Sequence, residues 1–110
     1  LVRGRVDGIV LPPPLCDSED VLRALEAADI PAVAVATGRS APATSAVSID
    51  DSRAAYEMTR HLIRLGHNRI GFIKGHPNQS ASARRYEGYC AALTEAGLAA
   101  DEALAAQGFF

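Results

Sequence analysis

The sequence DDSRAAYEMTRHLIRLGHNR, residues 50–69, is followed by IGFIKG at 70–75 and SARRYEGY at 82–89. Asp50 and Asp51 stand at the start of a predicted helix, where the helix dipole favours negative charge. The helix is predicted from about Ser52 to Leu65, and Gly66 supplies its left-handed C-terminal cap. The apolar residues predicted to form its buried face are Ala54, Ala55, Met58, Leu62 and Leu65.

A strand, a loop and a second helix are predicted after this first helix. Residues 70–73 form a short apolar run typical of a buried strand, and residues 75–79 have loop composition. Ser80 or Ser82 is predicted to cap the second helix, which ends at Gly97. The residues at i, i+3, i+4 and i+7 spacing on this helix are Tyr86, Tyr89, Cys90 and Leu93.

The N-terminal part of the chain begins with a predicted strand at residues 7–11. Three prolines at 12–14 end this strand, because proline cannot extend a central strand. Asp17 or Ser18 is predicted to cap a helix that ends before Pro31, since the residue preceding a proline avoids helical geometry.

The remaining segments complete an alternation of strands and helices. Strands are predicted at 32–36 and 46–49, separated by a loop at 37–45. Residues 98–107 are predicted to be a connector, and residues 108–110 the start of a strand. Short apolar strands that alternate with helices predict an α/β fold of parallel sheets flanked by helices.

The composition is that of a globular domain and excludes several classes of function. Of the 110 residues, 48% are hydrophobic and 22% charged, with a net charge of −2. Neither half of the chain has the strongly basic character that binding of nucleic-acid phosphates requires. No segment reaches the ~20 apolar residues that span a bilayer. Cys16 and Cys90 are expected to be free thiols in a reducing cytoplasm.

Sequence motifs for catalysis, cofactors and metals are missing. There is no phosphate-binding loop, no dinucleotide-binding glycine fingerprint and no nucleophile elbow. The histidines His61, His67 and His76 do not have metal-ligand spacing. We therefore expect neither an enzyme nor a bound cofactor or metal.

Arg85 is the strongest candidate for ligand binding. It lies in the first turn of the second helix, at the carboxyl edge of the predicted sheet, where open α/β sheets bind ligands. A guanidinium there can grip two oxygens of a sugar or a carboxylate. The alternative is a solvated surface arginine, which is the usual state of charged side chains. The neighbouring Arg84 is expected to point elsewhere and to remain on the surface.

Gln79 and Ser82 are further candidates, because their amide and hydroxyl groups could bind a polyol; the alternative is that the loop serines only cap the helix. The adjacent carboxylates of Asp50 and Asp51 could indicate acid–base catalysis. Their position at a helix start favours a structural role instead.

The pattern as a whole resembles the effector-binding domain of the LacI/GalR family of bacterial transcriptional regulators. The segments that carry the resemblance are VDGIVL (6–11), IPAVAV (30–35), V-x-I-D (47–50), HLIRLGHNRIGFIKG (61–75) and R-x-x-G-Y-x-x-A-L-x-x-A-G-L (85–98). The Gly-His turn and the spaced Arg-x-x-Gly-Tyr are the more specific motifs among these.

The resemblance implies part of a bilobal, periplasmic-binding-protein-like fold, truncated at both ends. Residues 1–49 would be the end of the N-terminal lobe, and residues 50–110 the first part of the C-terminal lobe. An effector would bind in the cleft between the lobes. The implied contacts are Arg85, Ser82 and Gln79, with Asp50 near the crossover and Thr37 from the other lobe.

The same resemblance implies the partners. They are a sugar or sugar-like effector, a second copy of the chain in a homodimer, and operator DNA bound only through a head domain absent from these residues. No membrane partner is implied, and the location would be the cytoplasm. The alternative is a periplasmic sugar-binding protein of a transporter, which shares the bilobal fold. The Gly-His turn and the unpaired cysteines favour the regulator.

Overall fold

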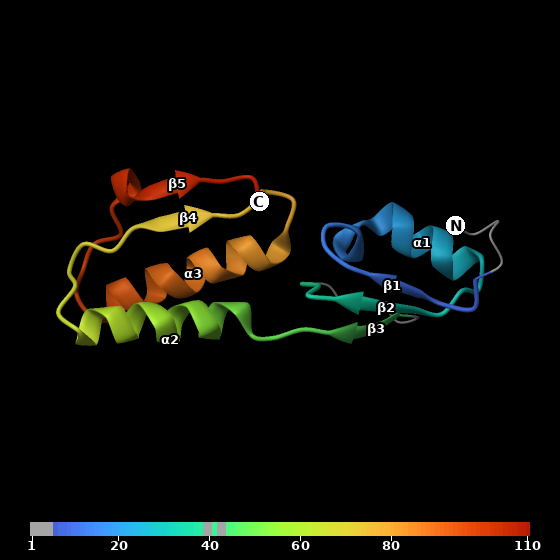
Figure 1. The fold of residues 1–110 in the computed structure, drawn as a ribbon, viewed down its shortest axis with the longest axis horizontal. Helices are drawn as coiled ribbons and strands as arrows, with labels where there is room; N and C mark the ends of the chain where they lie inside the picture. The colour runs from blue at the N-terminus through green and yellow to red at the C-terminus, as the bar shows by residue number, and fades with distance from the viewer. Residues whose placement is uncertain (1–5, 39–40, 42–43) are drawn as a thin grey trace. The chain divides into compact units, whose positions relative to one another are not determined.

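The computed structural model describes residues 6–38, 41 and 44–110, and the chain divides into two compact units. The first unit is Leu1–Ile49 and the second is Asp50–Phe110. Each contains a parallel sheet with helical segments packed against it (Figure 1). The predicted α/β class, with parallel strands and flanking helices, is therefore confirmed.

The first unit has a three-stranded parallel sheet in the order β1-β2-β3. The strands are β1 (Ile9–Leu11), β2 (Ala32–Val35) and β3 (Thr44–Val47). A 3-10 turn, η2 (Leu15–Asp17), and the helix α1 (Glu19–Ala27) connect β1 to β2. Both pack on the sheet and bury a small aliphatic core of Leu11, Cys16, Leu25, Ala32 and Ala34.

The strand predicted at 46–49 begins and ends two residues earlier, at Thr44 and Val47. Its register explains the difference, because Val35 pairs with Val47 and is the last residue of β2. Ala36 then turns away with a φ of 58°, although its N–H still donates to Val47 O at 2.8 Å. Beyond Val47 the strand therefore has no partner in β2.

Helix α1 confirms one predicted cap and ends differently from the prediction. The Ser18 hydroxyl accepts a hydrogen bond from Val21 N, so Ser18 is the N-cap. At the other end Asp29 takes a φ of 52° and its N–H donates to Glu26 O, while Ile30 N donates to Leu25 O. This is a Schellman ending, which closes the helix before Pro31 has any effect.

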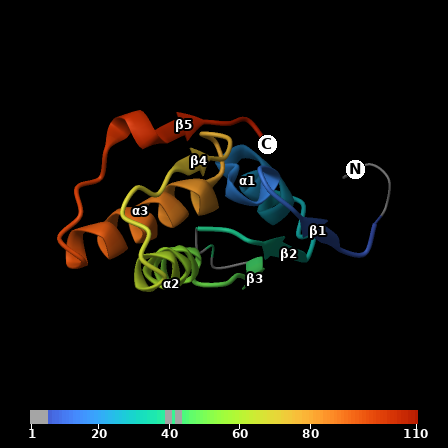
Figure 2. The same ribbon diagram turned by 60° about the vertical axis from the view of Figure 1, so that its left-hand side comes forward.

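The second unit has a two-stranded parallel sheet of β4 (Phe72–Lys74) and β5 (Ala105–Gln107). Helix α3 (Ser80–Glu95) packs on β4, and helix α2 (Asp51–Arg64) packs on α3, as Figure 1 and the turned view in Figure 2 show. The core between these elements contains Ile70, Tyr89 and Leu93, with Leu62, Ile63, Phe72, Tyr86, Cys90 and Leu98 packed around them. The predicted apolar face of α3 is thus confirmed.

The strands of the second unit differ from the predicted ones. Strand β4 starts at Phe72 and not at Ile70, whose carbonyl instead accepts a hydrogen bond from Tyr89 Oη at 2.7 Å. The predicted connector at 98–107 contains both the 3-10 turn η3 (Glu102–Leu104) and β5. Alanine has a low strand propensity, so the pairing with β4 determines this strand and the local sequence does not.

Helices α2 and α3 both end at a glycine with a positive φ, and the first of these glycines belongs to the Gly-His turn. Gly66 has a φ of 94°; its N–H donates to Ile63 O, and His67 N donates to Leu62 O. Gly97, with a φ of 72°, closes α3 in the same way. Both predicted glycine caps are confirmed, and both form Schellman motifs.

The predicted buried face of α2 is wrong in part. Leu62 packs against the core and Ala55 is half-buried, but Ala54, Met58 and Leu65 are exposed. Asp51 and Thr59 are buried instead. The buried side of α2 therefore includes two polar residues that the apolar spacing did not predict. The N-cap of α3 is Gln79, without a side-chain capping bond, so capping by Ser80 or Ser82 is also wrong.

Helices long and apolar enough to cross a membrane do not occur among the residues that the structure describes.

Candidate ligand-binding site

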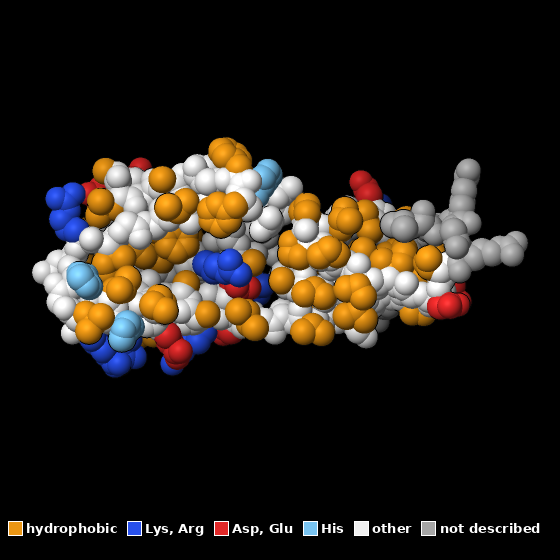
Figure 3. Space-filling view, viewed as in Figure 1, with side chains coloured by type: hydrophobic (Ala, Val, Ile, Leu, Met, Phe, Trp, Pro, Cys, Tyr) orange, Lys and Arg blue, Asp and Glu red, His pale blue; other side chains and the backbone are white. Residues whose placement is uncertain are grey.

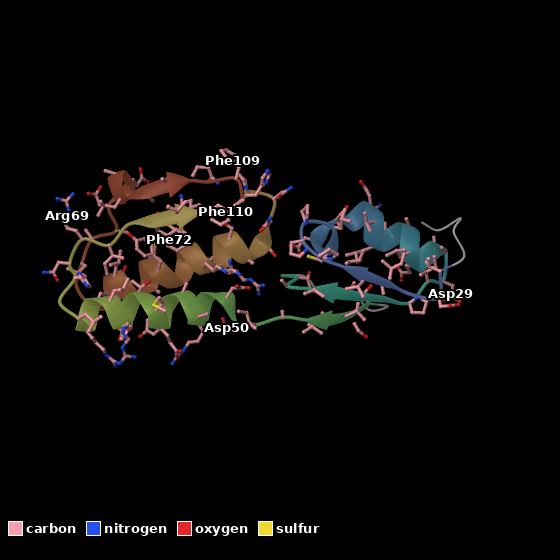
Figure 4. All side chains as sticks on the ribbon, in the orientation of Figure 1. Asp29, Asp50, Arg69, Phe72, Phe109 and Phe110 are labelled. Atoms are coloured by element: carbon pink, nitrogen blue, oxygen red, sulfur yellow. The ribbon has the colours of Figure 1, made fainter. Side chains whose placement is uncertain are left out.

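Three predicted binding residues line one cavity at the carboxyl end of β4. The cavity has a volume of about 200 Å³, below the range of about 300–1,000 Å³ that is usual for ligand pockets. Its lining consists of Phe72, Ile73, Gly75, Gln79, Ser82, Arg85 and Phe110, of which Figure 4 labels the two phenylalanines.

The loop after β4 is tied to the end of β5, which fixes the shape of this cavity. Gln107 Nε2 donates to Gly75 O at 2.7 Å, and Gly108 N donates to Lys74 O at 2.8 Å. His76 N donates to Phe110 O at 3.3 Å. Parallel strands bring these two loops to the same edge of the sheet.

Arg85 combines a fixed position with unused hydrogen-bond donors. Its Nε donates to Asp51 Oδ1 at 2.7 Å, while its side chain stays 51% exposed. Within the described part of the chain, no hydrogen bond or ion pair engages its two terminal nitrogens. A guanidinium has five N–H donors, so four remain for a ligand.

Asp51 is the residue that the sequence did not reveal as part of the site. Its side chain is 1% exposed, although it belongs to the first turn of a helix. Its second oxygen, Oδ2, lies 3.7 Å from Arg84 Nη2. Arg84 is therefore partly buried and paired, and the prediction that it points elsewhere is wrong. Figure 3 shows basic and acidic side chains side by side over the starts of α2 and α3.

Gly88 explains how a carboxylate on α2 reaches arginines on α3. A Cβ atom at this position would overlap the carbonyl oxygen of Ser52 and lie 2.9 Å from Tyr56 N. Only glycine allows the two helices to approach this closely. Arg85 lies about one turn before Gly88 on the same helix, and so reaches Asp51 at the start of α2. The Arg-x-x-Gly motif is thus a packing requirement of the site.

The cluster brings two cations to one buried anion. The guanidinium groups of Arg84 and Arg85 both face the carboxylate of Asp51. The buried position of Asp51 strengthens the attraction, because the effective dielectric constant there is lower than in water. The arrangement suits oxygen-rich ligand groups, which accept hydrogen bonds from arginine in pairs.

Asp50 has a different role in the structure from its neighbour. Its side chain is exposed and accepts a hydrogen bond from Arg53 N at 2.9 Å, so it is the N-cap of α2 (Figure 4). This agrees with the structural role expected for a carboxylate at the start of the helix. Its contact with a ligand stays a prediction.

Thr37 belongs to the first unit and follows the end of β2. It is 6% exposed, and its hydroxyl donates to Asp17 Oδ1 at 2.7 Å. Gly38 N donates to the same oxygen at 3.1 Å. The hydrogen bond to Asp17 gives Thr37 a structural task, and its binding role stays a prediction.

The neighbouring Cys16 is buried in the core of the first unit. Burial, together with the charge of Asp17, raises the pKa of its thiol, which therefore stays neutral.

A cluster of three or more histidine, cysteine or acidic side chains that could hold a metal ion does not occur in the part of the chain described here.

Comparison with known proteins places this geometry in a family. Residues 1–107 match the model for "Periplasmic binding proteins and sugar binding domain of LacI family". The maltose regulon regulatory protein MalI of Escherichia coli K12 is 35% identical over 98 residues, which are 89% of this chain and 29% of MalI. The chain thus spans less than a third of the length of this relative.

Solved structures give the same result for the fold. The transcription regulator CcpA of Lactococcus lactis has a TM-score of 0.82 and 32% identity, over 99% of this chain and 40% of its own. The complex of the transcriptional regulator CelR with cellobiose has a TM-score of 0.84 and 32% identity, over 99% of this chain and 34% of its own. The chain therefore belongs to the family of periplasmic binding proteins and sugar-binding domains of LacI-type regulators.

Proposed function

We propose that the chain is the effector-sensing part of a LacI-type transcriptional repressor, and that its effector is a sugar or a sugar-like molecule. The observation that carries the proposal is Arg85, a half-exposed guanidinium with free terminal donors at the edge of a preformed cavity. Two relatives support the class of ligand: CelR was solved with cellobiose, and MalI is named for a maltose regulon.

The proposed contacts of the effector are Arg85, Gln79 and Ser82 in the cavity, with Asp50 and Thr37 as further contacts. Residues 1–49 and 50–110 would be parts of the two lobes of the effector domain. Binding would act as a switch if the effector has different affinities for two states of the whole protein. Operator DNA would be bound by a head domain outside these residues, in a cytoplasmic homodimer. The protein would act by binding, not by catalysis.

The test uses the full-length protein and isothermal titration calorimetry with maltose, cellobiose, D-ribose, D-glucose and D-galactose. We expect Arg85→Ala to weaken binding of the tightest of these sugars at least about tenfold, since hydrogen bonds to charged groups contribute about 1.5–3 kcal/mol. Operator binding and dimerisation should stay unchanged. The control is Arg53→Ala, which removes an exposed arginine paired with Glu57 on α2. Equal sugar affinity in Arg85→Ala and wild type would contradict the assignment.

The alternative function is a periplasmic sugar-binding protein, which the matched family also includes. The coding sequence upstream of Leu1 distinguishes the two. A basic segment of roughly 60 residues with a helix-turn-helix pattern supports the regulator. A signal peptide with a charged start, an apolar core and a small-residue cleavage site supports the transport protein.

A further inference from the structure

We propose that Asp51 is a positioning residue of the effector site, which holds the Arg85 guanidinium by Nε and so directs its terminal nitrogens to the ligand. The proposal rests on the proposed function, because it assumes that Arg85 contacts the effector. It assigns a binding role to a buried carboxylate that makes no contact with the ligand itself.

The geometry of the contact carries the first step. Asp51 Oδ1 receives the Nε–H of Arg85 at 2.7 Å, and Nε lies at the base of the guanidinium plane. A bond at this atom restricts rotation of the plane while it leaves the two terminal nitrogens unused. Without the carboxylate, a half-exposed arginine would sample many rotamers, and a ligand would have to order it on binding.

The burial of Asp51 carries the second step. A carboxylate that is 1% exposed cannot move to another position without leaving the helix contact. It is fixed by the first turn of α2, where the helix start favours negative charge, and by the close approach of α3 at Gly88. Arg85 is thus anchored to the backbone of a second helix.

The incomplete pairing of Asp51 carries the third step. Its Oδ2 atom is buried without a hydrogen-bond partner, and Arg84 Nη2 lies 3.7 Å from it. Burying a charged cluster with an unsatisfied acceptor is a poor way to stabilise a fold. The cluster is better explained by the placement of Arg85 than by stability.

The first experiment measures sugar affinity in the full-length protein. Asp51→Asn keeps the size of the side chain and removes its charge. For whichever of maltose, cellobiose and D-ribose binds the wild type most tightly, calorimetry should show at least about tenfold weaker binding, comparable to the loss of one charged hydrogen bond. In the Arg85→Ala background the same substitution should change affinity less than twofold, because the residue that it positions is gone.

The matched control is Thr59→Ala. Thr59 is buried on the same face of α2 two turns further on, where its hydroxyl donates to Ala55 O, and it does not contact Arg85. This variant should lower the thermal midpoint yet keep the affinity of the wild type. If Thr59→Ala weakened binding as much as Asp51→Asn, the effect would be general destabilisation, and the proposal would be wrong.

The second experiment needs no ligand. In protein labelled with ¹⁵N-arginine, the Arg85 Nε–H signal is assigned as the one lost in Arg85→Lys. Its heteronuclear NOE should indicate a rigid group in the wild type and in Thr59→Ala, and a mobile group in Asp51→Asn. An equally rigid Arg85 in Asp51→Asn would overturn the proposal. If Asp51→Asn does not fold, Asp51→Ser is measured in its place.

The outcomes separate this inference from the proposed function. If Arg85→Ala binds the sugars as the wild type does, the effector site itself is misassigned. If Arg85→Ala loses binding while Asp51→Asn keeps it, the site stands and the positioning role of Asp51 is refuted.

Discussion

A buried or partly buried aspartate holds a candidate binding residue in each of the two units, with opposite results. In the first unit Asp17 accepts the hydroxyl of Thr37, and in the second Asp51 accepts Nε of Arg85. The Thr37 hydroxyl has only one hydrogen to donate, and the residue is 6% exposed. Arg85 uses one of its five N–H donors in the bond to Asp51, and its side chain stays half exposed. A carboxylate can thus immobilise a short side chain completely, but it orients a long one and leaves it able to bind.

The two units also differ in which residue types adopt the left-handed backbone conformation. Among the described residues with positive φ, the second unit has Gly66 and Gly97, while the first has Asp29 and Ala36. Side chains other than glycine are strained in this conformation. Alanine has no side-chain group that compensates for this strain, so Ala36 is the strained position of the first unit.

The largest expected effect tests the helix contact that the first unit lacks. Gly88→Ala should lower the free energy of unfolding by about 3 kcal/mol, at the upper end of typical overpacking costs, since the new Cβ would overlap Ser52 O. Urea denaturation of the full-length protein measures the change. The control Glu87→Ala alters the exposed neighbour and should stay within about 0.5 kcal/mol. A tolerated Gly88→Ala would mean that α2 and α3 do not touch here.

A smaller effect tests the polar contact of the first unit. Thr37→Val keeps the shape of the side chain and removes its hydroxyl, which donates to the Asp17 carboxylate. We expect a loss of about 1.5–2 kcal/mol, typical of a hydrogen bond to a charged group. Sugar affinity of the full-length protein should change far less than in Arg85→Ala. A tenfold loss of affinity with unchanged stability would reverse the comparison and make Thr37 the ligand contact.

A neutral hydrogen bond in the second unit should contribute less. Tyr89→Phe removes the bond from Tyr89 Oη to Ile70 O and should cost about 1 kcal/mol at neutral pH. Burial raises the pKa of Tyr89 in the folded state. Its stabilising contribution is therefore complete below the ordinary tyrosine pKa of about 10 and is lost as the pH rises above it. Urea titrations at neutral and alkaline pH should show the gap between the two proteins closing; a constant gap would argue against the buried hydroxyl.

The smallest effect has opposite signs in the two units. Ala36→Gly should raise the free energy of unfolding by about 0.5 kcal/mol, because it relieves a φ of 58°. Gly66→Ala should lower the free energy of unfolding by about 1 kcal/mol, because alanine is strained at the positive φ of this position. A steric clash does not contribute, since nothing lies within 4 Å of the added Cβ. Both are measured by thermal and urea unfolding. If both substitutions changed the free energy of unfolding in the same direction, backbone strain would not be a difference between the two units.

Much of the fold was predictable because its signals are local. Ser18 and Asp50 cap helices through residues three positions away, and Gly66 and Gly97 end helices through bonds within six residues. The strand β5 was missed because an alanine-rich stretch has no local strand signal and becomes a strand only beside β4.

The candidate site was predictable only in part. Gln79, Ser82 and Arg85 were predicted as contacts from their place after a strand; the structure brings them to one cavity, and their binding role stays a prediction. Asp51 was predicted, with Asp50, to have a structural role at a helix start, and the local sequence did not indicate that it would be buried beside Arg85. The buried face of α2 was predicted only in part, because its apolar spacing did not reveal that the contact with α3 would bury Asp51 and Thr59.

The sequence by itself determined the alternation of strands and helices, most of the helix ends and the position of Arg85 at the start of α3. Those features depend on bonds and backbone preferences between residues a few positions apart. Only the tertiary structure decided that Asp51 is buried, that it holds Arg85 across 34 residues of chain, and that Gly88 makes this contact possible. These features depend on two helices approaching within contact distance, which no local pattern records.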